Sequence, residues 1–299
     1  MRLSAPAIGR PWLGQVSKSL RWLPLLVAAG GMLQVFLLRR GIARAQALSA
    51  GGQRFERRMT QEGLRILVLG DSTGVGIGAD RPEESIAGLL ADEFPDADIV
   101  NVSRSGARMA DVVAQARLCS SSGLHFDVAF LHVGGNDILR STPAQKLADD
   151  CEQLMAEMPR LSARTVWLGP PNLGIAPLFP WPFSWLMTTR SRAAAALFAR
   201  SAGRHGVTFV DFSSREHEAR LSRRRAPSFS VDGLHPNSST YRYGYTVARQ
   251  ALESELFAKR RLTPSEVEAG SAAVDEPSPQ ATRPDQPLLL QEECVTVSV

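Results

Sequence analysis

Short apolar runs alternate with amphipathic stretches through the middle of this 299-residue chain. The apolar runs have the length and composition of buried strands, and they cover residues 65–70, 98–101, 128–133, 165–169 and 207–211. Helical periodicity lies between and after them, over about 83–93, 110–121, 143–161, 190–204 and 239–259. Strands that alternate with helices form right-handed crossovers, so this order predicts a parallel sheet covered by helices on both faces.

One segment interrupts this alternation. Residues 170–188 are rich in proline and in large apolar side chains, among them Phe179, Trp181, Phe183 and Trp185. The composition predicts a long irregular loop. Such a loop beside a strand end forms a pocket wall, a flap that faces a membrane, or a simple cover for the core.

The two ends of the chain carry opposite charge. Residues 1–65 have a net charge of +9 and residues 263–299 a net charge of −6, against +4 for the whole chain. The middle is nearly neutral and has no basic stripe interleaved with aromatic residues, so we expect no nucleic acid partner. The three cysteines are widely spaced and form no CxxC pair, which argues against a zinc knuckle, a redox pair and a disulfide-stapled domain: Cys119, Cys151 and Cys294.

The basic N-terminal segment, residues 1–50, contains an apolar run over 22–38 with arginines on both sides. Because about 17 residues is the lower limit for crossing a bilayer, we expect a membrane anchor that either spans or lies in the interface, on a side that the charges leave open. A cleaved signal peptide of an exported soluble protein and a helix packed on a cytoplasmic domain are the alternatives. The rest divides into a linker, a globular domain and a disordered acidic tail rich in proline and serine: residues 51–63, 64–260 and 261–299.

Ser72 directly follows the first predicted strand, in Gly70-Asp71-Ser72, where open α/β sheets place their ligands. A serine hydroxyl needs a neighbouring base to become a nucleophile. Asp232 and His235 share the loop before the last helix, where the carboxylate can orient the imidazole toward Ser72. The chain order Ser, Asp, His is one that catalytic triads use. Taken singly, Ser72 is equally typical of a helix N-cap, and the Asp232 loop of a polar turn.

Two further loops offer hydrogen-bond donors for an oxyanion. Gly106 follows the second strand and lets the backbone approach a ligand closely, while Asn136 follows the third strand with a side-chain amide. A flexible turn and a helix cap are the alternatives for these two residues. His132 lies inside an apolar strand, which indicates a core residue or one that supports the site.

These blocks resemble, in order and spacing, the four conserved blocks of the SGNH hydrolase family, also called GDSL esterases/lipases. The resemblance covers about residues 64–257 and rests on Gly70-Asp71-Ser72, Gly106, Gly134-Gly135-Asn136-Asp137 and Asp232-Gly233-Leu234-His235. The family takes the name GDSL from a Gly-Asp-Ser-Leu motif, and in this chain Thr73 takes the place of the leucine. The resemblance implies a flavodoxin-like three-layer α/β/α sandwich with a five-stranded parallel sheet.

For the site, the resemblance implies that Ser72 is the nucleophile, His235 its base and Asp232 the group that orients the base. It also implies an oxyanion hole made of the Ser72 N–H, the Gly106 N–H and the side chain of Asn136. In similar proteins the positions of Asp71 and Asp137 are structural.

We therefore expect a serine esterase or lipase-like hydrolase that cleaves small-molecule or lipid carboxylic esters through an acyl-serine, without a metal or an organic cofactor. An acyltransferase, or a deacetylase acting on glycan O-acyl groups, would use the same triad. Residues 74–79 formally fit a dinucleotide fingerprint, but the second strand ends at Asn101 rather than at an acidic residue. Nucleotide binding and a non-catalytic module remain as alternatives.

Overall fold

The computed structural model describes residues 23–59, 63–222 and 228–261. Residue 22 of the apolar run and the predicted tail from residue 262 onward lie outside this part of the chain.

Five parallel strands form a single sheet in the order β2-β1-β3-β4-β5. The strands are β1 (Arg65–Gly70), β2 (Asp98–Asn101), β3 (Phe126–His132), β4 (Ser162–Leu168) and β5 (Thr208–Val210). The chain first adds β2 on one side of β1 and then continues with β3 on the other side. This reversal creates a crevice beyond the carboxyl ends of β1 and β3, where proteins of this topology bind their ligands.

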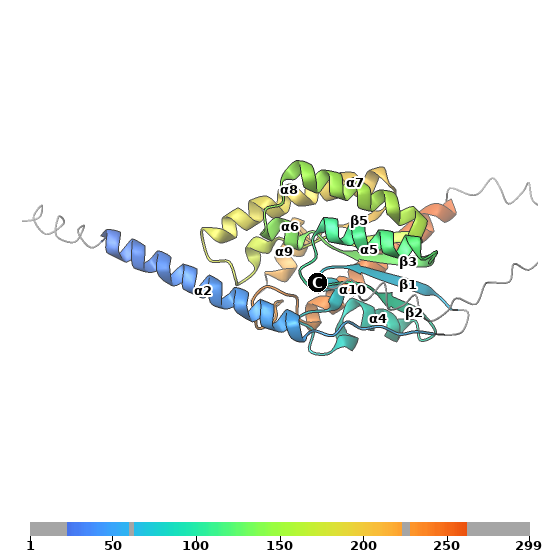
Figure 1. The fold of residues 1–299 in the computed structure, drawn as a ribbon, viewed down its shortest axis with the longest axis horizontal. Helices are drawn as coiled ribbons and strands as arrows, with labels where there is room; N and C mark the ends of the chain where they lie inside the picture. The colour runs from blue at the N-terminus through green and yellow to red at the C-terminus, as the bar shows by residue number, and fades with distance from the viewer. Residues whose placement is uncertain (1–22, 60–62, 223–227, 262–299) are drawn as a thin grey trace, which may run out of the picture.

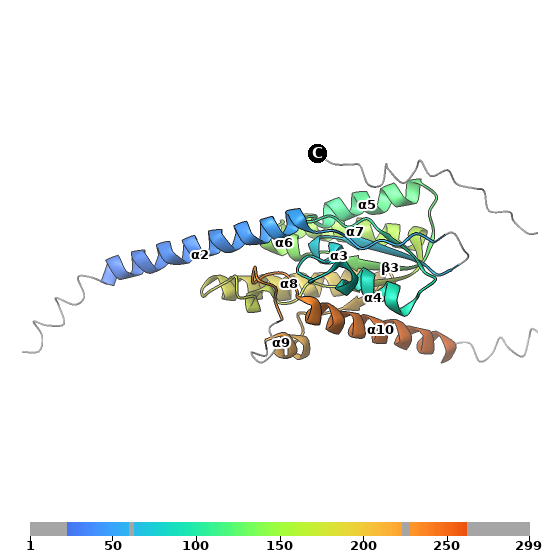
Figure 2. The same cartoon turned by 90° about the horizontal axis from the view of Figure 1, so that it is seen from below.

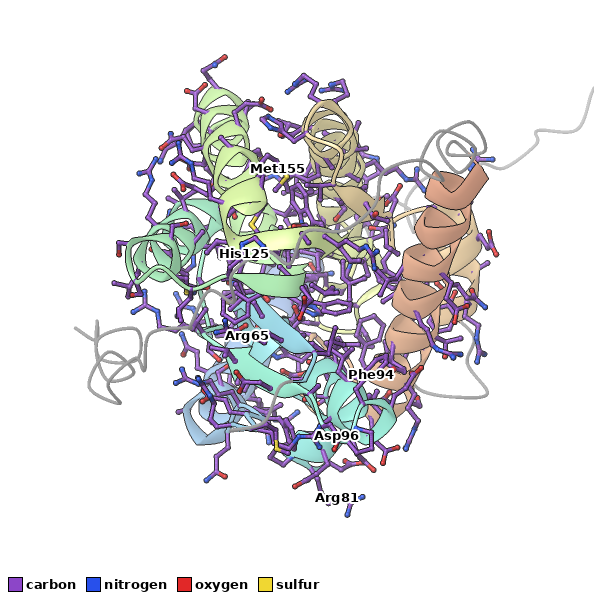
Figure 3. The ribbon with its side chains drawn as sticks, turned by 90° about the vertical axis from the view of Figure 1, so that its right-hand side faces the viewer. Arg65, Arg81, Phe94, Asp96, His125 and Met155 are labelled. Atoms are coloured by element: carbon purple, nitrogen blue, oxygen red, sulfur yellow. The ribbon has the colours of Figure 1, made fainter. Side chains whose placement is uncertain are left out.

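Helices cover both faces of the sheet, as the sequence predicts (Figures 1 and 3). One face carries α4 (Ile86–Glu93) and α10 (Ser238–Arg261), and the other carries α5 (Met109–Ser121), α7 (Ala144–Leu161) and α8 (Phe183–Arg204). Shorter helices and turns lie in the connections: α3 (Ser72–Val75), η1 (Pro82–Glu84), α6 (Gly135–Leu139), η2 (Leu173–Ile175) and α9 (Arg215–Leu221). The three-layer sandwich is thereby confirmed.

The strands are apolar along their whole length because both of their faces are buried. Successive side chains of a strand point to opposite faces, and in β1 Leu67 and Leu69 join the core under α5, α7 and α8, whereas Ile66 and Val68 join the core under α4 and α10. Figure 3 looks at the edge where β1 begins at Arg65 and where His125 precedes β3. The opposite edge, with the carboxyl ends of the strands, carries the candidate site.

A long helix, α2 (Leu23–Gly51), precedes the sheet. Its first half extends away from the body of the protein, and its second half lies against the domain (Figures 1 and 2). No helix in the described ranges is both long enough and apolar enough to cross a membrane.

Two predictions from the sequence need correction. Residues 183–188 are helical and form the start of α8, because Pro182 precedes the helix, where a proline removes no helical hydrogen bond. The predicted linker also packs on the domain: the backbone of Arg57 pairs with Ile99 of β2, and its guanidinium donates to the Ala91 carbonyl at 2.9 Å. Arg57 thus ties residues 54–59 to the edge of the sheet.

Candidate active site

Ser72 lies at a sharp turn immediately beyond β1. The turn begins at Gly70, whose φ of +147° and close approach to β3 exclude a side chain, since a Cβ there would lie 2.1 Å from the carbonyl oxygen of His132. The next residue, Asp71, donates its N–H to that same carbonyl at 2.8 Å. Ser72 is therefore held at the carboxyl edge of the two central strands.

Asp71, and not Ser72, caps the short helix α3. Its Oδ1 accepts hydrogen bonds from the Thr73 N–H at 2.9 Å and from the Thr73 hydroxyl at 2.7 Å. The alternative role of Ser72 as an N-cap is thus wrong, and its hydroxyl is available for another partner. Burial raises the pKa of Asp71 to about 6, although the hydrogen bonds from Thr73 act in the opposite direction.

Replacing Asp71 by asparagine should stabilise the protein more at high pH than at low pH. Above about pH 6 the buried carboxyl is ionised in the folded state, which costs stability, and as the pH falls the folded state takes up a proton before the unfolded chain does. The gain in unfolding free energy for Asp71→Asn, measured by urea denaturation, should be about 1–2 kcal/mol larger near pH 8 than near pH 4.5. An equal effect at both values would contradict the raised pKa.

The loop before α10 holds Asp232 and His235 in a fixed arrangement. Asp232 Oδ1 accepts the backbone N–H groups of Leu234 at 2.9 Å and His235 at 3.0 Å, so the carboxylate closes its own turn. Gly233 takes a φ of +72° within this turn, a conformation that favours glycine. A β-bridge between Phe229 and Pro236 fastens the two ends of the loop.

The structure brings the three predicted residues into one line. His235 Nε2 lies 2.9 Å from Ser72 Oγ, and His235 Nδ1 lies 2.5 Å from Asp232 Oδ2. All three residues are buried. Burial by itself would raise the pKa of Asp232, but the hydrogen bonds from His235 and from the backbone of Leu234 outweigh it and hold that pKa below its ordinary value. An ionised Asp232 keeps the Nδ1 proton in place and leaves Nε2 free to accept a proton from Ser72.

Gly106 and Asn136 reach the same cavity as Ser72 and His235. Asn136 lies inside α6 rather than at its cap, and its Nδ2 donates to the Ala107 carbonyl at 3.1 Å. The neighbouring Asp137 accepts the Met109 N–H at 2.9 Å and thereby connects α6 to the loop that contains Gly106. The second Nδ2 proton of Asn136 can therefore serve a ligand beside Ser72.

With this geometry in place, the comparison with known families is decisive. A family model described as the GDSL-like lipase/acylhydrolase family matches residues 68–243. This chain belongs to the GDSL-like lipase/acylhydrolase family. The match includes Ser72, Gly106, Asn136, Asp232 and His235 and leaves α2 outside it.

Several solved structures are similar to this chain. The structure described as TesA aligns with a TM-score of 0.51 at 21% identity, covering 64% of this chain and 98% of that chain. The native aryl esterase of M. smegmatis gives 0.48 at 19% identity, covering 64% and 99%. Est24, a carbohydrate acetylesterase from Sinorhizobium meliloti, gives 0.47 at 16% identity, also covering 64% and 99%. A comparison with curated proteins gives no match.

The other four histidines of this GDSL-type domain lie outside the hydrogen-bonded group of Ser72, His235 and Asp232. His125, His205 and His217 pair respectively with the Arg160 carbonyl, Glu152 and the Tyr243 hydroxyl. His132 lines the cavity that Ser72 and His235 share, and burial lowers its pKa to about 4, which keeps the imidazole neutral. Within the described residues its Nε2 has no hydrogen-bond partner.

Two residues to which the sequence analysis gives no role in the site hold the turn that follows Ser72. Asn101 donates its Nδ2 to the Gly74 carbonyl at 2.9 Å, and Tyr241 donates its hydroxyl to the Ile77 carbonyl at 2.8 Å. The glycines of the formal dinucleotide fingerprint serve packing instead: a Cβ at Gly78 would lie 2.3 Å from the Pro236 carbonyl. Through these contacts the segment after Ser72 packs against the loop that contains His235. Over the described ranges, no group of three or more His, Cys, Asp or Glu side chains is placed to hold a metal ion.

A cavity of about 690 Å³ extends from Ser72 and His235. Its lining is largely apolar and includes Leu178 and Phe179 of the proline-rich segment and Met187 of α8. The expectation that residues 170–188 form a pocket wall is confirmed for these three positions. The helix α2 also contributes to the lining, with Leu38, Ile42, Ala45, Gln46 and Ser49.

The sequence predicts no contribution of α2 to this cavity. The apolar run ending at Leu38 favours a membrane segment, with a helix packed on the domain as an alternative. The structure shows that the second half of α2 lines the cavity beside Ser72, packed so closely that a Cβ at Gly41 would lie 2.1 Å from Leu178 Cδ1. The predicted boundary at residue 50 therefore does not separate this helix from the domain.

Proposed function

We propose that this protein is a serine esterase that cleaves carboxylic esters with an apolar acyl group. The observation that carries the proposal is the line Ser72–His235–Asp232 at the wall of a mostly apolar cavity. The hydrogen-bonded line supplies a nucleophile and a base, and the cavity supplies room for the acyl chain. An apolar lining favours an acyl chain over the polar ring of a glycan as the group that is held.

In the proposed reaction, Ser72 Oγ attacks the ester carbonyl while His235 Nε2 takes the hydroxyl proton. The resulting oxyanion is held by the N–H groups of Ser72 and Gly106 and by the Asn136 amide. The Ser72 N–H belongs to the first turn of α3, where backbone donors have no acceptor within the helix. His235 then protonates the leaving alcohol, and a water activated by the same imidazole releases the acid from the acyl-serine.

The proposal is tested with a panel of p-nitrophenyl esters from acetate through octanoate to palmitate, together with a fluorophosphonate probe that labels activated serines. We expect hydrolysis of the panel and a single labelled peptide that contains Ser72. An alcohol acceptor added to the assay distinguishes hydrolysis from acyl transfer, because an acyltransferase would form the new ester in preference to the free acid. Absence of both hydrolysis and labelling would overturn the proposal.

Asn136→Ala should lower kcat for p-nitrophenyl butyrate by about 10²–10³-fold, because the amide donates to an oxygen that becomes fully charged only in the transition state. The melting temperature of the variant checks that the lost bond to Ala107 has not disturbed the fold. A change confined to KM would show that Asn136 binds the substrate without stabilising the oxyanion.

Ala45→Phe should shorten the acyl chain that the enzyme accepts. Ala45 is buried and faces the cavity from α2, so a phenyl ring there occupies space that a long chain needs. We expect kcat/KM for the octanoate ester to fall by about tenfold or more relative to the acetate ester. Ala43→Phe is the matched control, since Ala43 is exposed on the same helix and does not line the cavity. Parallel changes for both esters would remove Ala45 from the acyl site.

A further inference from the structure

The first half of α2 exposes a broad apolar face. Met32, Leu33, Val35, Phe36 and Leu37 are all exposed, with 58% of Phe36 accessible to solvent. Spaced by 100° per residue, these five residues cover somewhat more than half of the circumference of the helix, and Gln34 lies on the remaining side. So broad an apolar face on a helix is normally covered by protein or by lipid. This half of α2 extends beyond the body of the protein (Figures 1 and 2).

Two tryptophans lie beside this exposed half. Trp181 lies just before the start of α8 and is 75% exposed, and Trp185 lies in the first turn of α8 and is 66% exposed. Gln34 of α2 donates its Nε2 to the Trp181 carbonyl at 3.0 Å, which fixes the tryptophan turn against the helix. Tryptophan is the residue most suited to the boundary between headgroups and acyl chains, because its ring is apolar and its N–H is polar.

The charged residues of α2 are all basic. Arg39, Arg40 and Arg44 follow the apolar residues on α2 and are exposed. The first acidic residue of the chain is Glu56, so none lies on α2 or before it. Basic residues next to an apolar helix favour a surface of anionic lipid. A symmetric contact between two copies through this face would instead bring the arginines together without a carboxylate from α2.

We propose that the exposed half of α2 and the adjoining tryptophan turn form a docking surface for an anionic lipid bilayer, made of Met32, Leu33, Val35, Phe36, Leu37, Trp181 and Trp185. The docking surface is continuous with the cavity, because the next turns of the same helix supply Leu38 and Ile42 to the cavity wall. A helix lying in the headgroup region would thus bring the catalytic cavity to the surface where lipid esters are found. The binding itself does not depend on the proposed esterase activity.

The test is co-sedimentation of the full-length chain with vesicles of phosphatidylcholine and phosphatidylglycerol, without substrate. We expect the wild type to bind these vesicles, and to bind them better than vesicles of phosphatidylcholine alone. The double variant Phe36→Glu, Trp185→Glu should weaken binding by about tenfold or more, since each change removes an aromatic ring that would be buried in lipid. A milder pair, Phe36→Ser and Trp185→Ser, should weaken it in the same direction.

The pair Ala196→Glu, Ala199→Glu is the matched control, because it adds the same two charges at exposed positions farther along α8 and should leave vesicle binding unchanged. Neither Phe36 nor Trp185 lines the cavity, so hydrolysis of dissolved p-nitrophenyl butyrate should be equal in all these proteins. Wild-type binding by the double variant, or no binding by the wild type, overturns the proposal. A wild-type dimer in sedimentation velocity that the double variant dissociates would overturn it in favour of a second copy.

Discussion

Ser72→Ala is expected to lower kcat for ester hydrolysis by at least about 10³-fold while the fold is retained. The hydroxyl is the proposed nucleophile, because its oxygen lies 2.9 Å from His235 Nε2, the atom that takes its proton. The backbone at this position is fixed by Gly70 and by the Asp71 cap, neither of which uses the Ser72 side chain. Fold stability should therefore change little.

The measurement is kcat for p-nitrophenyl butyrate together with fluorophosphonate labelling, which Ser72→Ala should abolish. Ser105→Ala is the matched control: Ser105 also lines the cavity, but no histidine lies within hydrogen-bond distance of its hydroxyl in the described structure. Activity of Ser72→Ala within about threefold of the wild type would refute the assignment of the nucleophile.

The sheet was predictable because its strands are buried on both faces and read as short, nearly continuous apolar runs. Element boundaries were less predictable. β3 begins at Phe126 and β4 at Ser162, earlier than the apolar runs at 128 and 165, because these two residues pair with each other across the sheet. Pairing between strands depends on the partner sequence as well as on the local pattern.

The convergence of the site was predictable from topology, since all parallel strands end at the same edge. That argument places Ser72, Gly106 and Asn136 near one another. The sequence did not reveal which side chain caps α3, because Asp71 and Ser72 are both good N-cap residues. It also did not reveal the supporting hydrogen bonds of Asn101 and Tyr241, whose partners lie 27 and 164 positions away.

The cavity wall made by α2 illustrates a different limit. An apolar run with arginines on both sides has the same pattern whether it lies in lipid or against a protein cavity. In this structure a stretch exposed at Phe36 and a stretch that lines the cavity from Leu38 onward follow one another along a single helix. Only the three-dimensional position of Leu178 and Ser72 distinguishes the second half of the helix from the first.

Asp232→Asn should lower kcat by about 10³–10⁴-fold even though the side chain keeps its shape. Oδ1 of Asp232 accepts the N–H groups of Leu234 and His235, so the carbonyl oxygen of an asparagine must remain at that position. Its amide NH₂ then faces His235 Nδ1 and can only donate. The imidazole must carry its proton on Nε2, where it points at Ser72 and cannot accept the hydroxyl proton.

Asp211→Asn is the matched control for this change. Asp211 Oδ1 accepts the Ser213 N–H in a similar turn after β5, and no histidine contacts it in the described structure, so its replacement should leave kcat close to that of the wild type. Circular dichroism of Asp232→Asn should match the wild type, because the turn is closed by an oxygen that asparagine retains. If Asp232→Asn kept wild-type kcat, the carboxylate would serve only to close its loop, and the tautomer of His235 would have to be set by another group.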